Sequence, residues 1–237
     1  MTGGRLRGEG LLALWGNADP EQDAGFNDWY THEHLPERIA VPGFLRARRY
    51  VADLPGPAPH WTYLTLYETD TLATLSSPGY LRALDTPTEG TRRYLPLFGA
   101  MARTGCRVTY SAGTGEGGDI AFVELGPRAD PDALRRWIVD EHAPAVLDRS
   151  GVLAVHLAEA DPDATAVRDR TESYRGVPTT AGRWLLLVEG ATVDPAAARE
   201  RLAADVADLE AHGADVGGAQ LFRLLARLTP DRQRPAP

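Results

Sequence analysis

The sequence predicts an α+β protein in which two tandem ferredoxin-like repeats, each βαββαβ, form an intrachain pseudo-dimeric α/β barrel. One observation behind this prediction is an internal repeat: the motif W-x-x-x-E-H-x-P at 29–36 recurs at 137–144, and Gly43 recurs as Gly151. The other is that each half shows the same order of strand and helix patterns. A ferredoxin-like unit has helices on only one face of its sheet, so two units can bury the open faces by packing sheet on sheet.

A glycine-rich segment, SAGTGEGG at 111–118, separates the repeats and is typical of a linker. The predicted boundaries are therefore 8–110 for the first repeat and 119–230 for the second. Residues 231–237 are predicted to form a disordered tail.

The first repeat begins with an apolar strand and continues with an amphipathic helix. Asp70 and Thr71 can cap a short turn. Thr86 or Thr88 can cap a later helix, with Pro87 in its first turn. In order, we expect a strand at 11–16, a helix at about 22–39, strands at 44–52 and 60–69, a helical region at 78–102 and a strand at 105–112.

The second repeat follows the same order. Asp194 can cap its last helix, with Pro195 at the first helical position. The polar segment 161–182 has no clear period and is predicted to be an excursion between strands. In order, we expect a strand at 120–125, a helix at 131–147, strands at 151–160 and 182–193, a helix at 194–211 and a strand at 219–228.

Each of the two first helices carries a histidine on its apolar stripe. Phe26, Tyr30 and His34 are spaced four residues apart, as are Leu134, Ile138 and His142. Because this stripe must face the sheet, we expect both histidines to point inward. A proline follows each histidine by two residues and should loosen the helix there. His32 lies off the stripe and is expected to be solvated.

A half-buried imidazole beside Glu33 could act as a general acid or base, which makes His34, Glu33 and His142 the candidate catalytic residues. A neighbouring carboxylate would raise the pKa of the imidazole, and burial would lower it. The alternative is that each histidine is a satisfied core group.

Aromatic residues make a ligand-binding site more plausible in the first half than in the second. Period two places Trp61, Tyr63, Thr65 and Tyr67 on one face of a strand, whereas the matching second-half strand is nearly all aliphatic. The alternative is a packing layer inside the barrel. Three arginines follow the first helix: Arg46, Arg48 and Arg49. Some of them could anchor a carboxylate, phenolate or enolate, and the others would be surface charges.

The stretch FNDWYTHEHLP, continued by VPGFLRARRY, resembles the signature of EthD-like proteins in the dimeric α/β-barrel superfamily. The match rests on His34, Pro36, Pro42, Gly43 and Tyr50. This resemblance implies a fold shared by cofactor-free dehydratases and cyclases, decarboxylases, cofactor-free monooxygenases and some haem enzymes. It would place an acid/base role on His34.

We therefore expect an enzyme without a cofactor, a dehydratase- or cyclase-type lyase of bacterial secondary metabolism that acts on an aromatic or polyketide-like substrate. The expected substrate-binding residues are Trp29, Tyr30, Tyr50, Trp61, Tyr63 and Tyr67. One alternative is a cofactor-free monooxygenase or a haem enzyme, with His34, His142 or His156 as the iron ligand. Another is a ligand-binding protein without turnover.

Composition excludes several classes of function and of site. The net charge of −8 argues against binding to nucleic acid or anionic membranes. All basic residues other than histidine are arginine, which excludes a lysine Schiff base, and the lone Cys106 excludes an intrachain disulfide. The HEH motif at 32–34 is not a metal site, because residues two apart diverge on a helix. We expect a cytoplasmic protein, monomeric or homodimeric, without a resident metal.

Overall fold

The computed structural model describes residues 5–17, 21, 23–52, 61–94, 96, 101–167, 171, 182–191 and 193–230. The predicted tail at 231–237 and most of the predicted excursion at 161–182 lie outside these residues. The first repeat contains β1 (Gly10–Gly16), α1 (Asp23–Trp29), η1 (Tyr30–His34), α2 (Leu35–Ile39), β2 (Phe44–Ala52), β3 (Tyr63–Thr69), η2 (Leu72–Ser76), α3 (Pro78–Asp85), α4 (Glu89–Tyr94) and β4 (Met101–Gly113). The second contains β5 (Asp119–Pro127), α5 (Pro131–Trp137), η4 (Ile138–His142), α6 (Ala143–Leu147), β6 (Val152–Ala160), α7 (Pro162–Ala166), β7 (Trp184–Gly190), α8 (Pro195–Ala211) and β8 (Ala214–Leu228).

Most elements begin and end near their predicted positions. The helix predicted at 131–147 is α5, η4 and α6 in continuous sequence, and Asp194 caps α8 by accepting the N–H groups of Ala196 and Ala197 at 2.9 and 3.2 Å. The helical region predicted at 78–102 is wrong in extent, because α3 ends before Thr86 and β4 already begins at Met101. Thr86 precedes a proline, which disfavours helical backbone.

The strands of the described chain close into an antiparallel barrel in the order β1-β3-β2-β8-β5-β7-β6-β4. Each repeat supplies one half, β4-β1-β3-β2 or β8-β5-β7-β6, which is the strand order of a ferredoxin-like sheet. The β2–β8 and β4–β6 pairs join the halves. This confirms the predicted α+β barrel built from two repeats on one chain.

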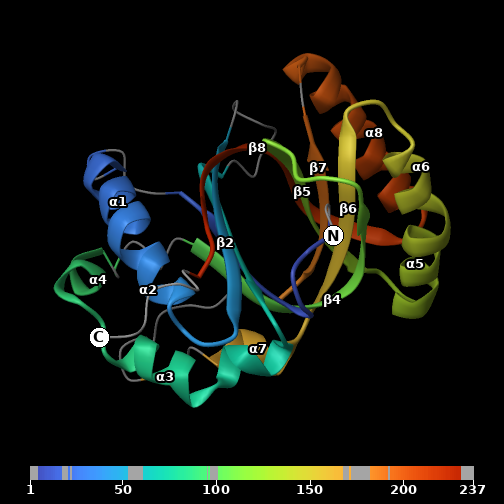
Figure 1. Cartoon of the computed structure of the whole chain (residues 1–237). Helices are drawn as coiled ribbons and strands as arrows, with labels where there is room; N and C mark the ends of the chain where they lie inside the picture. Colours follow the sequence, from blue (N-terminus) through green and yellow to red (C-terminus); the bar gives the residue numbers. More distant parts are fainter. Residues whose placement is uncertain are drawn as a thin grey trace.

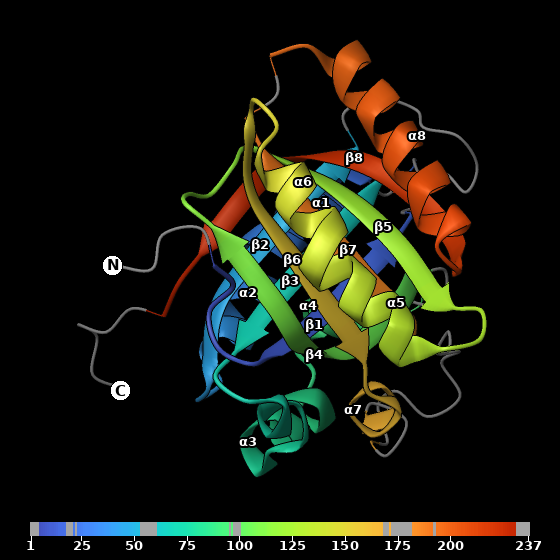
Figure 2. The same ribbon diagram turned by 90° about the vertical axis from the view of Figure 1, so that its right-hand side faces the viewer.

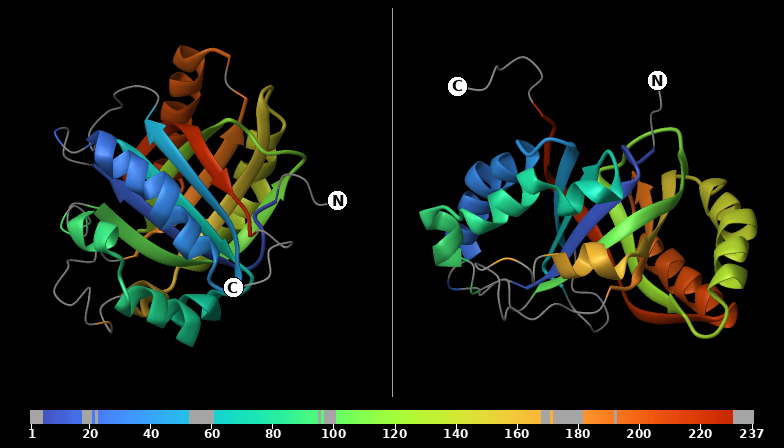
Figure 3. Two further views of the ribbon diagram at one scale, coloured as in Figure 1. Left: turned by 60° about the vertical axis from the view of Figure 1, so that its left-hand side comes forward. Right: turned by 90° about the horizontal axis from the view of Figure 1, so that it is seen from below.

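Most helices lie outside the barrel in two groups on opposite sides, and α7 lies beside α3 at the lower end of the view (Figure 1). Helices α1 to α4 cover the first half, and α5, α6 and α8 cover the second, which Figure 2 shows face on. The view from below in Figure 3 shows the barrel between the two groups. None of the described helices has the length and apolar character needed to cross a bilayer.

Alternation along the strands separates the barrel interior from the two helix-covered faces. On β1, Leu11, Ala13 and Trp15 belong to the interior cluster, while Leu12 and Leu14 pack under the helices of the first half. A residue's position in the alternation therefore decides whether its side chain can reach a site under the helices.

One end of the barrel interior contains a buried network of charges. Arg46 donates from Nε and Nη2 to both oxygens of Glu68, at 2.8 Å each. Arg48 bridges the repeats, because it pairs with Glu68 at 3.1 Å and with Glu189 at 2.6 Å. His156 Nε2 lies 3.0 Å from Glu189. Since these side chains are almost fully buried, each charge depends on its partners.

The chain segments at this end of the barrel are tied to the same network. Glu116, within the predicted linker, forms an ion pair with Arg46, and the Gly117 N–H donates to Glu189 at 3.3 Å. The Arg7 N–H donates to Glu68 at 2.7 Å. The connection between the repeats is therefore held on the barrel by charged groups from both halves.

We expect the network to make stability sensitive to acid. Burial raises the pKa of Glu189, but the hydrogen bond to His156 and the charge of Arg48 outweigh it and lower the pKa from 4.5 to about 2. A carboxylate with a depressed pKa stabilises the fold above the unfolded-state value. The free energy of unfolding should therefore fall as the pH decreases from 4.5 through 2. Urea titrations across this range test it, and Glu189→Gln should flatten the dependence. Equal slopes in both proteins would contradict it.

Candidate functional site

The helix over the first half contains a π turn that ends at the candidate histidine. The Leu35 N–H donates to the carbonyl of Tyr30, five residues back, which defines the wide turn of η1. Pro36 follows and has no N–H to donate. The second half repeats the arrangement, with the Ala143 N–H bonded to Ile138. The predicted loosening of the helix at both histidines is confirmed, and such turns are frequent at functional sites.

His34 points inward and is 5% exposed. Its ring lies 4.8 Å from the ring of Trp29 and 4.9 Å from the ring of Tyr30, measured between centroids. Burial, together with the positive charges of Arg38 and Arg49, lowers the pKa of His34 well below its usual 6.5. The imidazole is therefore neutral at physiological pH and can accept a proton.

The environment of Glu33 differs from the expectation. Its carboxylate accepts a hydrogen bond from the hydroxyl of Thr88, which precedes α4. Of the two opposing effects expected on the pKa of His34, burial prevails, and two arginines lower the pKa further. Glu33 thus connects η1 to the α3–α4 region.

Aromatic rings surround His34 on its inner side. The Tyr30 ring packs edge-on against Phe26 at 5.4 Å, and Trp29 stacks on Tyr94 at 5.1 Å. Tyr67, on β3, lies in the same buried cluster as Tyr30, and burial raises the pKa of the Tyr67 phenol well above 10. The Tyr67 phenol therefore stays protonated and can donate a hydrogen bond.

Tyr63 marks the edge of this cluster nearest the start of α1. Its hydroxyl donates to the carboxylate of Asp23 at 2.7 Å and accepts from the side-chain amide of Asn27 at 2.6 Å. The Asp23 carboxylate is thus hydrogen-bonded to Tyr63 at the edge of the aromatic cluster.

Arg49 is one of the three arginines that the sequence offered as possible anion anchors, although it was not among the expected site residues. Its side chain is fully buried, with the guanidinium carbon 4.1 Å from the Tyr30 ring centroid and 4.6 Å from that of Tyr63. Within the described part of the chain it makes no ion pair, and its Nη1 donates weakly to the Asn27 carbonyl at 3.4 Å. The alternation along β2 indicated its position, because Arg49 points to the same helix-covered face of the sheet as Ala47 and Val51.

Two predicted substrate-binding residues lie on the other face of the sheet. Tyr50 belongs to the barrel interior, and Trp61 packs there against Trp15 at 6.3 Å and Phe122 at 5.7 Å. The predicted shared face of Trp61 and Tyr63 is wrong, because β3 begins only at Tyr63. The backbone of Trp61 is instead bonded to Gln220, whose side-chain oxygen accepts its N–H at 3.0 Å.

The second half keeps the histidine but lacks the arginine and the tyrosine that lie near it in the first half. His142 is 3% exposed, and its Nδ1 lies 3.1 Å from an Asp208 oxygen. Leu157 occupies the repeat position of Arg49, and Ile138 that of Tyr30. The two copies of the histidine therefore lie in chemically different pockets.

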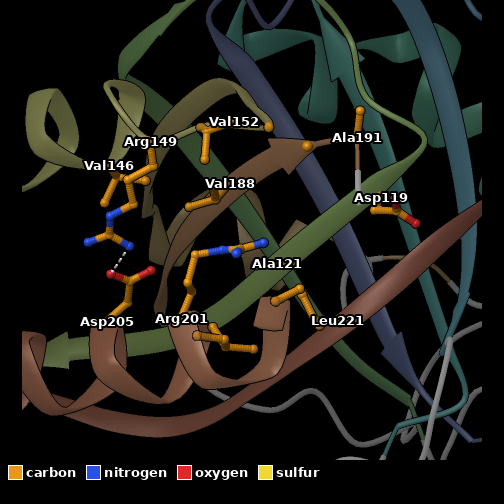
Figure 4. A pocket seen from close by; sticks show the side chains of 14 residues that line it. Asp119, Ala121, Val146, Arg149, Val152, Val188, Ala191, Arg201, Asp205 and Leu221 are labelled. Atoms are coloured by element: carbon orange, nitrogen blue, oxygen red, sulfur yellow. Dashed lines mark hydrogen bonds and ion pairs between the residues drawn. The ribbon is translucent and has the colours of Figure 1, made fainter. Parts of the chain in front are cut away.

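Beside the second-half helices lies a cavity of about 50 Å³, between α6, α8 and the sheet (Figure 4). Val146, Val188, Leu202 and Leu221 are among the apolar residues that line it. Arg149 pairs with Asp205 across it at 2.6 Å, as the dashed line in Figure 4 shows. Such a volume holds a few water molecules.

The described residues do not fit a haem. His142 has the carboxylate partner that metal-bound histidines use, but its side chain does not line the cavity between α6, α8 and the sheet, which is itself far smaller than a porphyrin ring. His156 has both ring nitrogens engaged, with Ser111 at 2.8 Å and Glu189 at 3.0 Å. His34 is packed against two aromatic rings.

No protein-family model matches this sequence, and a search of curated proteins found no match. Solved structures do share its fold. An anthrone oxidase-like protein is 12% identical with a TM-score of 0.59, over 98% of this chain and 96% of that one. A candidate monooxygenase from Fusobacterium nucleatum subsp. nucleatum is 9% identical with a TM-score of 0.53, over 94% and 95%. A chlorite dismutase variant from Candidatus Nitrospira defluvii in complex with cyanide is 12% identical with a TM-score of 0.51, over 92% and 91%. These similarities show the barrel fold of the dimeric α/β-barrel proteins.

Proposed function

We propose that the protein is a cofactor-independent enzyme that moves a proton on an aromatic or polyketide-like carbonyl compound, as a dehydratase- or cyclase-type lyase. The observation that carries this proposal is a buried, neutral His34 in an aromatic cluster that also contains the buried cation of Arg49. The resemblance of 26–50 to EthD-like proteins supports the same assignment.

In the proposed reaction His34 removes a proton from a carbon next to a carbonyl group. Burial, together with the guanidinium groups of Arg38 and Arg49, keeps the imidazole neutral before the step. Their positive charge favours the enolate that forms, and the phenols of Tyr30 and Tyr67 are hydrogen-bond donors in the same cluster. His34 then returns the proton to the leaving hydroxide, so that water departs.

The proposal assigns this chemistry to the first half. Trp29, Tyr30, Tyr63 and Tyr67 would line the substrate site, because they surround His34 or Arg49. The rings pack directly on one another, so a substrate must displace part of the cluster to bind. Binding by Tyr50 or Trp61 would require a separate site in the barrel interior, and catalytic use of His142 one under the helices of the second half.

A cofactor-free monooxygenase is the second candidate function, and the fold shared with an anthrone oxidase-like protein supports it. It would share the first step, because anthrone must lose a carbon-bound proton before its carbanion reacts with oxygen. Anthrone and O₂ would then give anthraquinone and water.

Anthrone provides a test that separates these candidates. In deuterium oxide without oxygen, the enzyme should accelerate exchange of the acidic C–H, measured by NMR. In air, an oxygen electrode reports whether oxidation follows. Exchange without oxygen uptake supports the proton-transfer enzyme, and uptake supports the monooxygenase. Binding of anthrone with neither exchange nor uptake would support a non-catalytic binding protein.

A further inference from the structure

Arg49 presents one edge of its guanidinium without an acceptor. Its Nε and Nη2 atoms are buried and donate to no described residue. The same edge of Arg46 binds both oxygens of Glu68 at 2.8 Å each, and that of Arg135 binds both oxygens of Glu159. Arginine in this protein therefore repeatedly uses the Nε–Nη2 edge to hold a planar carboxylate.

A buried cation of this kind is unfavourable unless something compensates it. Arginine stays protonated in proteins, so Arg49 carries its charge inside the aromatic cluster. The rings of Tyr30, Tyr63 and Phe26 supply partial compensation through cation–π contacts at 4.1, 4.6 and 5.3 Å. Burial nevertheless lowers the pKa of Arg49, which shows that these contacts do not offset desolvation fully.

A second buried polar group without a described partner lies on the neighbouring strand. Thr65 is the direct cross-strand partner of Arg49 in the β2–β3 pair. Its side chain is fully buried, and its hydroxyl has no hydrogen-bond partner among the described residues. Directly opposite residues on one sheet face have Cβ atoms about 5 Å apart, so both side chains start from the same place on the helix-facing side of the sheet.

The other repeat shows that the fold does not require this polar pair. The residues at the same positions in the β6–β7 pair are Leu157 and Leu186, both buried and apolar. A leucine pair thus fills the same place in the same kind of unit. The arginine and threonine are therefore features of the first half alone.

We propose that Arg49 and Thr65 form a carboxylate-binding subsite, and that the ligand of the first half is an aromatic or polyketide-like carboxylic acid. Resting on the proposed function, this inference narrows the substrate class to acids whose ring or chain reaches toward His34. The carboxylate would accept two hydrogen bonds from Arg49 and one from Thr65.

Binding of 1-naphthoate tests the subsite without requiring turnover. The neutral 1-naphthamide has the same ring and serves as the control ligand. By isothermal titration calorimetry, the wild type should bind the acid at least about tenfold more tightly than the amide. Arg49→Met should weaken naphthoate binding at least about 100-fold, and Thr65→Val about tenfold, with little effect on the amide.

Thermal stability distinguishes a ligand subsite from a structural arginine. Without ligand, Arg49→Met should melt at the wild-type temperature or up to about 5 °C above it. The reason is that an apolar side chain, which has no charge to desolvate, replaces a buried cation. A decrease in melting temperature would mean that Arg49 holds the fold. Thr65→Val is nearly isosteric and keeps the binding test informative even if Arg49→Met does not fold.

The outcomes also separate this inference from the proposed function. His34→Gln should keep naphthoate binding within a few-fold while it loses proton exchange. Equal affinity for acid and amide, or unchanged naphthoate binding in Thr65→Val and Arg49→Met, would overturn the subsite alone. Retained exchange in His34→Gln, with naphthoate binding still dependent on Arg49, would overturn the proton-transfer role alone.

Discussion

The His34→Gln variant should lose about 10²- to 10⁴-fold in the rate of proton exchange while it stays folded. Glutamine keeps the size and hydrogen-bonding ability of the side chain but cannot accept a proton near neutral pH. Because the pKa of His34 lies well below 6.5, the wild-type rate should be level at neutral pH and should decline only on the acid side of 6.5. Exchange rates measured by NMR between pH 4 and 8 would give both results.

His32→Gln is the matched control, since it makes the same change two residues away. His32 is exposed and its Nδ1 lies 3.0 Å from the carboxylate of Asp28 on the outer face of the helix. This variant should keep the wild-type rate within about twofold, as surface substitutions usually do. Equal losses in both variants would indicate a disturbed helix, and no loss in His34→Gln would refute the proton-transfer role.

Arg48→Met should destabilise the fold by about 3–5 kcal/mol, although Arg48 is the sequence neighbour of Arg49 and lies on the same strand. Arg48 points into the barrel, where it bonds to Glu189 at 2.6 Å and to Glu68 at 3.1 Å. Its removal leaves these two buried carboxylates with fewer positive partners. Urea unfolding of Arg48→Met and Arg49→Met should therefore shift the midpoint strongly downward for the first variant only.

A double substitution tests the cause of that loss. If the unpaired Glu189 is responsible, Glu189→Gln added to Arg48→Met should recover part of the lost stability, and the two effects should be non-additive. Strict additivity would mean that Arg48 contributes through packing of its stem. A wild-type midpoint for Arg48→Met would show that the network contributes little.

Local signals were sufficient to predict most of the fold. The four-residue spacing of Leu134, Ile138 and His142 located a helix and its inward face. Asp194 with Pro195 marked the beginning of another helix. The repeat then supplied the barrel, because it showed that two similar open sheets are present on one chain. These inferences needed only neighbours in sequence and one comparison of the chain with itself.

The candidate site was only partly predictable, because its decisive contacts are long-range. Alternation predicts that Arg48 and Arg49 point to opposite faces of β2, but not which arginine meets a carboxylate, since Glu189 lies 141 residues further along the chain. Trp61 was misplaced because the first residue of β3 could not be recognised from period two alone. His34, within a strongly amphipathic helix, was placed correctly.

Fusion of the two repeats has a genetic consequence. In a barrel assembled from two copies of one gene product, every substitution appears twice, so a costly buried arginine on one face must also be tolerated on the other. A single chain removes this coupling, and β2 can carry Arg49 while β6 carries Leu157 in the matching place. One half is free to diverge toward chemistry at the expense of its own stability, while its partner keeps the apolar packing that sustains the barrel.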